Sequence, residues 1–173
     1  MRASTLSALL LAPLLVLSGC GANGAAVSVG ASSSSSTGTS SGTSTLAFTG
    51  TTVDGDAFDG ASLAGKPTVL WFWAPWCSTC RAQAGGVADL AQRFEGKVNV
   101  VGVGGLSEDS DVRAFAEKVV GPTHLMDNPG EVWRHFGVTA QSTYVVLDAD
   151  GKIVEKGYLD DDALVDKVEQ LVS

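Results

Sequence analysis

Between residues 67 and 119, the hydrophobic positions switch between the period of a strand and that of a helix. Residues 67–73 are apolar on both faces apart from Thr68, which is typical of a central strand covered by helices. A helical spacing follows at Val87, Leu90, Ala91 and Phe94. A second β-rich run covers residues 98–103, and a second helical spacing comes at Val112, Phe115, Ala116 and Val119. This β-α-β-α order predicts a mostly parallel sheet.

Weaker patterns extend this order toward both ends of the chain. Apolar stretches at residues 46–52 and 57–58 flank the turn signal Asp54-Gly55, which predicts a leading β-hairpin. The remaining candidates are strands at 123–127, 143–147 and 152–158, a short helix at 131–136 and an amphipathic helix after Asp160. The strands at 143–147 and 152–158 flank Asp148-Ala149-Asp150-Gly151, which predicts a second hairpin. Residues 46–173 are therefore expected to fold as one α/β domain.

The first residues follow a different pattern. Arg2 precedes an apolar run at residues 6–17, which is too short to span roughly 30 Å of hydrocarbon as a mature helix. Residues 1–19 therefore read as an export signal. The run ends in Leu17-Ser18-Gly19-Cys20, which resembles the lipobox of bacterial lipoproteins and implies that Cys20 is lipidated. The alternative is an ordinary signal peptide that happens to end near a cysteine.

The segment after Cys20 has the composition of a flexible tether. From residue 21 to residue 45, 18 of 25 positions are Gly, Ser or Thr, so little apolar area is available to offset ordering entropy. A chain of this kind reaches roughly 25 to 30 Å. We therefore assign residues 20–45 to a lipidated cysteine and a tether that holds the domain away from a membrane.

Charge and cysteine content narrow the possible functions. The chain has 11 Lys and Arg against 19 Asp and Glu, a net charge of −8, which argues against nucleic acid as a partner. Its three cysteines are too few for a disulfide scaffold or a Cys₄ zinc site. If Cys20 carries lipid, Cys77 and Cys80 remain as a pair.

The candidate chemistry lies where the central strand gives way to a helix, at Cys77-Ser78-Thr79-Cys80. A helix N-terminus stabilises the thiolate of the first cysteine, so Cys77 is expected to be the exposed nucleophile and Cys80 the resolving thiol. The backbone N–H groups of residues 78–80 and the hydroxyls of Ser78 and Thr79 are candidate donors. Trp76 is expected to pack beside the thiol and to contact the substrate.

Three other uses of the cysteine pair fit the sequence less well. A c-type haem site needs His after the second cysteine, where Arg81 stands. A zinc site needs two further ligands, and only His124 and His135 are available, at no recognisable spacing. A structural disulfide that closes so short a loop contributes only roughly 2 kcal/mol. We therefore expect redox exchange, with no metal and no cofactor.

Three segments together resemble a known family. They are Phe72-Trp73-Ala74-Pro75-Trp76-Cys77-x-x-Cys80, Phe136-Gly137-Val138 ahead of residues 143–148, and Asp150-Gly151-Lys152-Ile153-Val154. They resemble thioredoxin-like proteins, most closely the exported TlpA/ResA and DsbE/DsbF-like lipoproteins. The resemblance implies a thioredoxin fold: a central mixed β-sheet flanked by helices, with an N-terminal β-hairpin extension.

Three positions depart from that family pattern. Ser142 stands where the loop facing the cysteines carries a cis-proline, and Gln83 stands where ResA-like proteins have Glu. Trp71 stands where thioredoxins have a buried Asp. Gln83 can form hydrogen bonds but cannot accept a proton from Cys80 as a carboxylate could. These departures leave the nucleophile in place but are expected to weaken the groups that support it.

The resemblance implies a membrane-tethered, extracytoplasmic thiol-disulfide oxidoreductase that exchanges disulfides with exported proteins through its WCxxC motif. Its expected partners are exported protein thiols or disulfides and a membrane redox partner. Its expected location is the extracytoplasmic face of a bacterial membrane, in the cell envelope, with the lipid anchor at Cys20. The alternative is a thioredoxin-fold binding or metal-responsive module with weak turnover, which Ser142 and Gln83 leave open.

Overall fold

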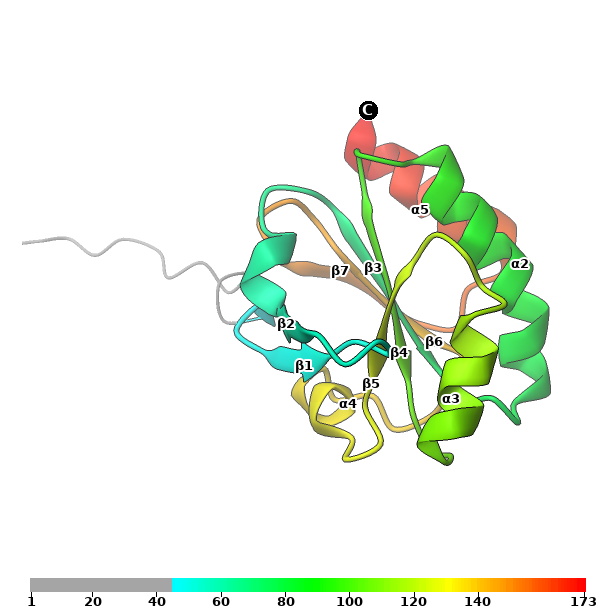
Figure 1. Ribbon diagram of the computed structural model, residues 1–173. Helices are drawn as coiled ribbons and strands as arrows, with labels where there is room; N and C mark the ends of the chain where they lie inside the picture. Colours follow the sequence, from blue (N-terminus) through cyan, green and yellow to red (C-terminus); the bar gives the residue numbers. More distant parts are fainter. Residues whose placement is uncertain (1–44) are drawn as a thin grey trace, which may run out of the picture. The chain divides into compact units, whose positions relative to one another are not determined.

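The computed structural model describes residues 45–173. The predicted export signal, most of the predicted tether and Cys20 lie outside the described residues, so those assignments stay predictions. The elements shown in Figure 1 are β1 (Thr49–Thr51), β2 (Ala57–Asp59), a 3₁₀ turn (Gly60–Leu63), β3 (Thr68–Trp73), α2 (Ser78–Arg93), β4 (Asn99–Gly104), α3 (Asp109–Ala116), β5 (Thr123–Met126), α4 (Glu131–His135), β6 (Thr143–Leu147), β7 (Ile153–Gly157) and α5 (Asp161–Val172).

Five strands form one mixed sheet in the order β5-β4-β3-β6-β7. β3 pairs with β4 and β4 with β5 in parallel, whereas β3 pairs with β6 and β6 with β7 antiparallel. The expectation of a mostly parallel sheet is therefore wrong. One reason is the predicted turn after β6, where Gly151 N–H donates to the Asp148 carbonyl at 3.0 Å and β7 turns back along β6. The mixed sheet of the thioredoxin fold is confirmed.

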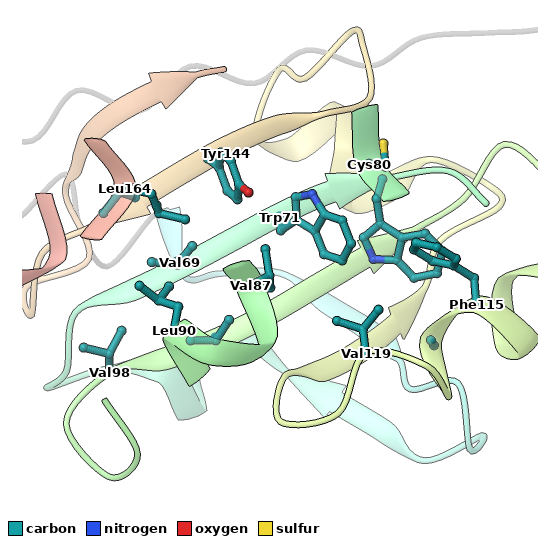
Figure 2. Packing of buried hydrophobic residues seen from close by; sticks show 14 of the residues in the cluster. Val69, Trp71, Cys80, Val87, Leu90, Val98, Phe115, Val119, Tyr144 and Leu164 are labelled. Atoms are coloured by element: carbon teal, nitrogen blue, oxygen red, sulfur yellow. The ribbon is translucent and has the colours of Figure 1, made fainter. Parts of the chain in front are cut away.

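Helices cover both faces of this sheet, as the doubly apolar pattern of β3 predicts. Val69, Trp71 and Trp73 pack on one face with α2, α3 and α5, while Leu70 and Phe72 pack on the other with α4. All five side chains are completely buried. Figure 2 shows the first face, where the Trp71 ring lies between α2 and the sheet. β3 is thus a rigid central strand, and the cysteine pair follows directly after it.

The N-terminal hairpin forms a separate two-stranded sheet. β1 and β2 are antiparallel, and the turn between them includes Gly55 in the left-handed region, at φ 96°. A single bridge between Thr52 and Leu125 joins the hairpin to the β5 edge of the main sheet. The predicted β-hairpin extension is confirmed, and it covers a strand edge that would otherwise be open.

Two helices differ in length from their sequence patterns. α3 ends at Ala116, so Val119 packs in the core from the turn that follows rather than from the helix. α2 continues without interruption through Gly85 and Gly86. Within residues 45–173, no helix has the length and apolar character needed to cross a bilayer.

Candidate active site

Cys77 lies at the junction between β3 and α2. Its N–H donates to the carbonyl of Ala74 at 3.1 Å, which closes the turn after the strand. Its backbone is extended, and its Sγ accepts the N–H of Cys80 at 3.1 Å. The sulfur therefore occupies the N-cap position of α2, where serine or aspartate oxygens usually accept this bond. An ionised sulfur at this position is stabilised by the free N–H groups of the first turn.

The two cysteines differ in burial. Both are free thiols, and Cys77 keeps 6% of its surface exposed whereas Cys80 keeps none. Cys77 is thus the more accessible of the pair, but it is far less exposed than expected. The reason is that the loop ending at Ser142 packs over both sulfurs.

The surroundings shift the two thiol pKa values in opposite directions. Burial alone would raise the pKa of Cys77, but it is outweighed by hydrogen bonds from the side chains of Cys80 and Ser142 and from backbone N–H groups of Cys80 and Thr79. The net pKa of Cys77 is lowered. Burial raises the pKa of Cys80, and the hydrogen bond with Cys77 raises it further. At neutral pH the thiolate is therefore favoured on Cys77.

The predicted donors Ser78 and Thr79 contribute less than expected. Both side chains are exposed, and within residues 45–173 no hydrogen bond joins either hydroxyl to a sulfur atom. Of these two residues, only Thr79 lowers the pKa of Cys77, and it does so through its backbone N–H. The direction of side chains in the first helical turn explains this, since they point outward while the N–H groups point toward the cap.

Ser142 supplies the hydroxyl that reaches both sulfurs. Its Oγ lies 3.1 Å from Cys77 Sγ and 3.3 Å from Cys80 Sγ. Its backbone is in the left-handed region, at φ 65°, which is uncommon for a residue with a Cβ. Its N–H donates to the carbonyl of Phe72 on β3 at 2.8 Å. Ser142 therefore faces the cysteine pair across the end of the central strand.

Gln83 positions Ser142, and among the described residues no hydrogen bond joins its side chain to a sulfur atom. This buried side chain accepts a hydrogen bond from Trp71 Nε1 at 2.9 Å through its Oε1. Its Nε2 donates to the backbone carbonyl of Ser142 at 3.4 Å. The three departures from the family pattern thus form one connected chain of hydrogen bonds. The sequence singled out each position but contained no signal that they contact one another.

Trp76 forms part of an exposed apolar rim. Its side chain is 53% exposed, and its Nε1 donates to the carbonyl of Leu106 at 2.8 Å. Leu106, also 53% exposed, follows β4 with φ 60°. A ring so exposed is available to a substrate, but the expected substrate contact of Trp76 stays a prediction. Leu106 was not foreseen, because an isolated leucine in a loop has no distinctive pattern.

Tyr144 is a second residue that the sequence did not single out. It lies opposite Trp71 in the β3–β6 pairing and on the same face of the sheet as Cys80 (Figure 2). Its fully buried hydroxyl has no hydrogen-bond partner among the described residues. Burial above all raises the pKa of Tyr144, and nearby negative charge at Asp161 and Cys80 adds to this. The hydroxyl therefore stays protonated.

The histidines lie apart from the cysteine pair and have other partners. His124 Nε2 donates to the Val119 carbonyl at 2.9 Å, and His135 Nε2 donates to the Thr45 carbonyl at 2.7 Å. In the part of the chain that the structure describes, no group of three His, Cys, Asp or Glu side chains could hold a metal ion.

Comparison with known proteins identifies relatives along most of the chain. The family model described as Redoxin matches residues 39–172. The soluble secreted antigen MPT53 of Mycobacterium tuberculosis is 40% identical over 107 residues, a match that covers 61% of this chain and 61% of MPT53. This match therefore spans less than two thirds of that relative's length.

Solved structures extend the similarity to almost the whole of two other proteins. MTB DsbF, solved in mixed oxidized and reduced forms, is 41% identical with a TM-score of 0.70, over 74% of this chain and 97% of DsbF. A secreted M. tuberculosis disulfide oxidoreductase homologous to E. coli DsbE is 36% identical with a TM-score of 0.67, over 73% of this chain and 98% of that one. Because the family model covers most of the chain and both structures share its fold, the chain belongs to the Redoxin family and is related to DsbF and DsbE-like disulfide oxidoreductases.

Proposed function

We propose that the protein is a thiol-disulfide oxidoreductase in which Cys77 is the nucleophile and Cys80 is the resolving thiol. The observation that supports this most directly is the N-cap position of Cys77 Sγ, which accepts the Cys80 N–H at 3.1 Å. Hydrogen bonds outweigh burial and lower the pKa of Cys77, whereas burial outweighs them and raises the pKa of the fully buried Cys80. The pair is therefore divided into a sulfur that reacts first and one that reacts second.

The exchange takes place in two steps. Cys77 thiolate attacks one sulfur of a substrate disulfide, forms a mixed disulfide and releases the other substrate sulfur as a thiolate. Cys80 then attacks Cys77 Sγ, which forms the Cys77–Cys80 disulfide and releases the second substrate sulfur. Two electrons pass from the protein dithiol to the substrate, and the reverse sequence oxidises a substrate dithiol. Titration against glutathione assigns the direction, because potentials near about −120 mV and −270 mV mark oxidants and reductants respectively.

The proposed place of action is the extracytoplasmic face of a bacterial membrane. The relatives MPT53 and the DsbE homologue are described as secreted, and residues 1–19 have the pattern of an export signal. Exported protein thiols or disulfides are then the substrates, with a membrane redox partner that resets the cysteine pair. We further propose lipid attachment at Cys20, which rests on Leu17-Ser18-Gly19-Cys20 alone. Cys20→Ala should move the protein from the membrane fraction to the soluble fraction; an unchanged distribution would refute the anchor.

Trapping experiments test the order of the two cysteines. Cys80→Ser should accumulate mixed disulfides with substrate proteins, because the second step is blocked. Cys77→Ser should form none, because Cys80 is fully buried. The reverse pattern, or equal trapping by both variants, would refute the assignment.

A binding or metal-responsive module with weak turnover is the competing function. It is favoured by Gln83, whose neutral amide bonds to Trp71 and Ser142 and offers no carboxylate to Cys80. Multiple-turnover reduction of a disulfide-containing protein distinguishes the two functions. An oxidoreductase continues after the first equivalent of substrate, whereas a binding module stops there.

A further inference from the structure

The Ser142 hydroxyl lies between the two sulfurs, close enough to interact with each in turn. Its distances to Cys77 Sγ and Cys80 Sγ are 3.1 and 3.3 Å, both within the range of hydrogen bonds to sulfur. Among the described residues, no other hydroxyl or carboxylate forms a hydrogen bond with either sulfur atom. The hydroxyl therefore lies beside Cys80, which must lose a proton in the second exchange step, and beside Cys77 Sγ, from which the substrate sulfur departs.

Two hydrogen bonds and the adjoining strand hold Ser142 in this position. Its N–H donates to the Phe72 carbonyl at 2.8 Å, its carbonyl accepts from Gln83 Nε2 at 3.4 Å, and the next residue begins β6. Its φ of 65° is a conformation that glycine adopts more easily. The backbone strain at a residue with a functional side chain, stabilised by surrounding bonds, indicates a functional rather than a packing role.

The resolution step requires a proton to move at this place. Cys80 must lose its proton before it can attack Cys77 Sγ, yet burial, the largest influence on Cys80, raises its pKa. At the same time an aliphatic substrate thiolate leaves Cys77 Sγ and needs a proton. A disulfide bond is about 2 Å long, so the leaving sulfur stays within a few ångströms of Ser142 Oγ.

We propose that Ser142 is a catalytic proton carrier in the resolution of the mixed disulfide, an inference that rests on the proposed function. The proton of Cys80 passes to Ser142 Oγ while the Ser142 hydroxyl proton passes to the leaving substrate sulfur. The Sγ–Sγ bond between Cys77 and Cys80 forms as the bond from Cys77 Sγ to the substrate breaks. The mixed disulfide and the Cys80 thiol thus become the protein disulfide and a neutral substrate thiol, with Ser142 restored and no further reactant consumed.

This role explains how the site can work with Gln83 in place of a carboxylate. A carboxylate would accept the Cys80 proton and keep it, whereas a hydroxyl transfers a proton without holding one. The rate should therefore depend on how strongly the departing sulfur needs a proton. The release rate of aliphatic substrate thiols should depend on Ser142, and the release rate of an acidic aromatic thiol should not.

The test compares two leaving groups on the full chain. Mixed disulfides are formed at Cys77 with a cysteine-containing peptide and with thionitrobenzoate, and the release of each thiol is followed at neutral pH. Ser142→Ala should slow release of the peptide thiol by about 10-fold or more, a modest share of the usual range for acid–base catalysis. It should slow release of thionitrobenzoate less than about 2-fold, because that thiolate leaves without a proton.

Two further variants keep the result interpretable. Ser142→Gly also removes the hydroxyl while it relieves the φ of 65°, so it should behave like Ser142→Ala even if alanine is poorly tolerated. Ser62→Ala removes a serine hydroxyl in the 3₁₀ turn, which donates to the Asp59 carbonyl at 2.6 Å, and should leave both rates unchanged. Equal slowing of both leaving groups, or no slowing of either, would overturn the proposal. Absence of any thiol release from the wild type would instead refute the proposed function.

Discussion

The carboxylate of Asp161 lies directly against the backbone of Gly86. A Cβ at Gly86 would come within 2.5 Å of Asp161 Oδ1, so the first turn of α5 rests on α2 at a position where no side chain intervenes. Gly85, its neighbour in α2, meets nothing within 4 Å on the same criterion. A close contact thus accounts for the glycine at position 86, whereas the surroundings of position 85 leave room for a side chain.

Substitution of each glycine by alanine should separate these two situations. Gly85→Ala should raise the free energy of unfolding by about 1 kcal/mol, the intrinsic advantage of alanine inside a helix. Gly86→Ala should gain clearly less, because the Asp161 carboxylate must move away from the new methyl group. Urea unfolding of the two variants provides the measurement, and equal gains would contradict the prediction. In an Asp161→Ala background, Gly86→Ala should recover the missing part.

Tyr144→Phe should also stabilise the protein. The buried Tyr144 hydroxyl has no hydrogen-bond partner among the described residues, and an unsatisfied buried polar group costs about 1 to 3 kcal/mol. Phenylalanine keeps the ring, so a gain of about 1 kcal/mol in the free energy of unfolding is expected. Tyr158, which is largely exposed, is the matched control: Tyr158→Phe should change stability by less than about 0.5 kcal/mol. A loss of stability in Tyr144→Phe would show that the hydroxyl has a partner in solution.

The opposite pKa shifts predict how the two thiols react with pH. Hydrogen bonds outweigh burial and lower the pKa of Cys77, whereas burial and the neighbouring Cys77 raise that of Cys80. Alkylation of the reduced protein, followed for each cysteine by mass spectrometry, should reach half its maximal rate at lower pH for Cys77. The pH of half-maximal rate should lie below about 8.5, the ordinary thiol pKa, for Cys77 and above that pH for Cys80. Superimposable pH profiles for the two cysteines would contradict this assignment.

Much of the fold could be predicted because its signals are local. The apolar run of β3, the helical spacing that follows and the N-cap cysteine lie next to one another in the chain, so period and spacing were sufficient. The turn between Asp148 and Gly151 is also a local signal, and it predicted the hairpin of β6 and β7. The antiparallel pairing of β6 with β3 is not local, and only the resemblance to a family implied a mixed sheet.

Local sequence patterns could not predict most of the arrangement around the sulfurs. Trp71, Gln83 and Ser142 are separated by 12 and 59 residues along the chain, and only the folded sheet brings them together. A sequence shows that each position is unusual, but not that the changed residues bond to one another. Burial of Cys77 was missed for the same reason, since the covering loop comes 65 residues later.

His124 should make stability depend on pH. Its buried Nδ1 has no hydrogen-bond partner within residues 45–173, and burial lowers the pKa of His124 although the Val119 carbonyl partly opposes this. The unfolded chain therefore binds this proton more readily than the folded protein. The contribution of neutral His124 to the free energy of unfolding is complete above the ordinary histidine pKa near 6.5. As pH falls below that value the contribution is lost, by at most about 1.4 kcal/mol per pH unit. Urea unfolding between pH 8 and 5, a window about the ordinary value, is the measurement.

The variant His124→Gln isolates this contribution from that of Asp127. Burial raises the pKa of Asp127, so acidification favours the folded state at this residue, which is the opposite sign. Asp127 is present in both proteins and cancels in their difference. The difference in stability between wild type and His124→Gln should therefore shrink as pH falls below about 6.5. A difference that does not vary with pH would show that His124 does not titrate in this range.

The start of the domain should depend on close packing at Gly60. A Cβ at Gly60 would come within 2.5 Å of the Phe48 ring and 2.6 Å of the Leu46 carbonyl, and the second of these is backbone that cannot turn aside. Phe48 also packs edge-on against Phe136, with ring centroids 5.3 Å apart, so its ring has little room to shift. Gly60→Ala should therefore lower the free energy of unfolding by about 1 to 3 kcal/mol, the usual cost of overpacking. Gly85→Ala, which adds the same methyl group in open space, is the control, and a Gly60→Ala variant as stable as the wild type would mean that the segment before β1 is not held as the structure describes.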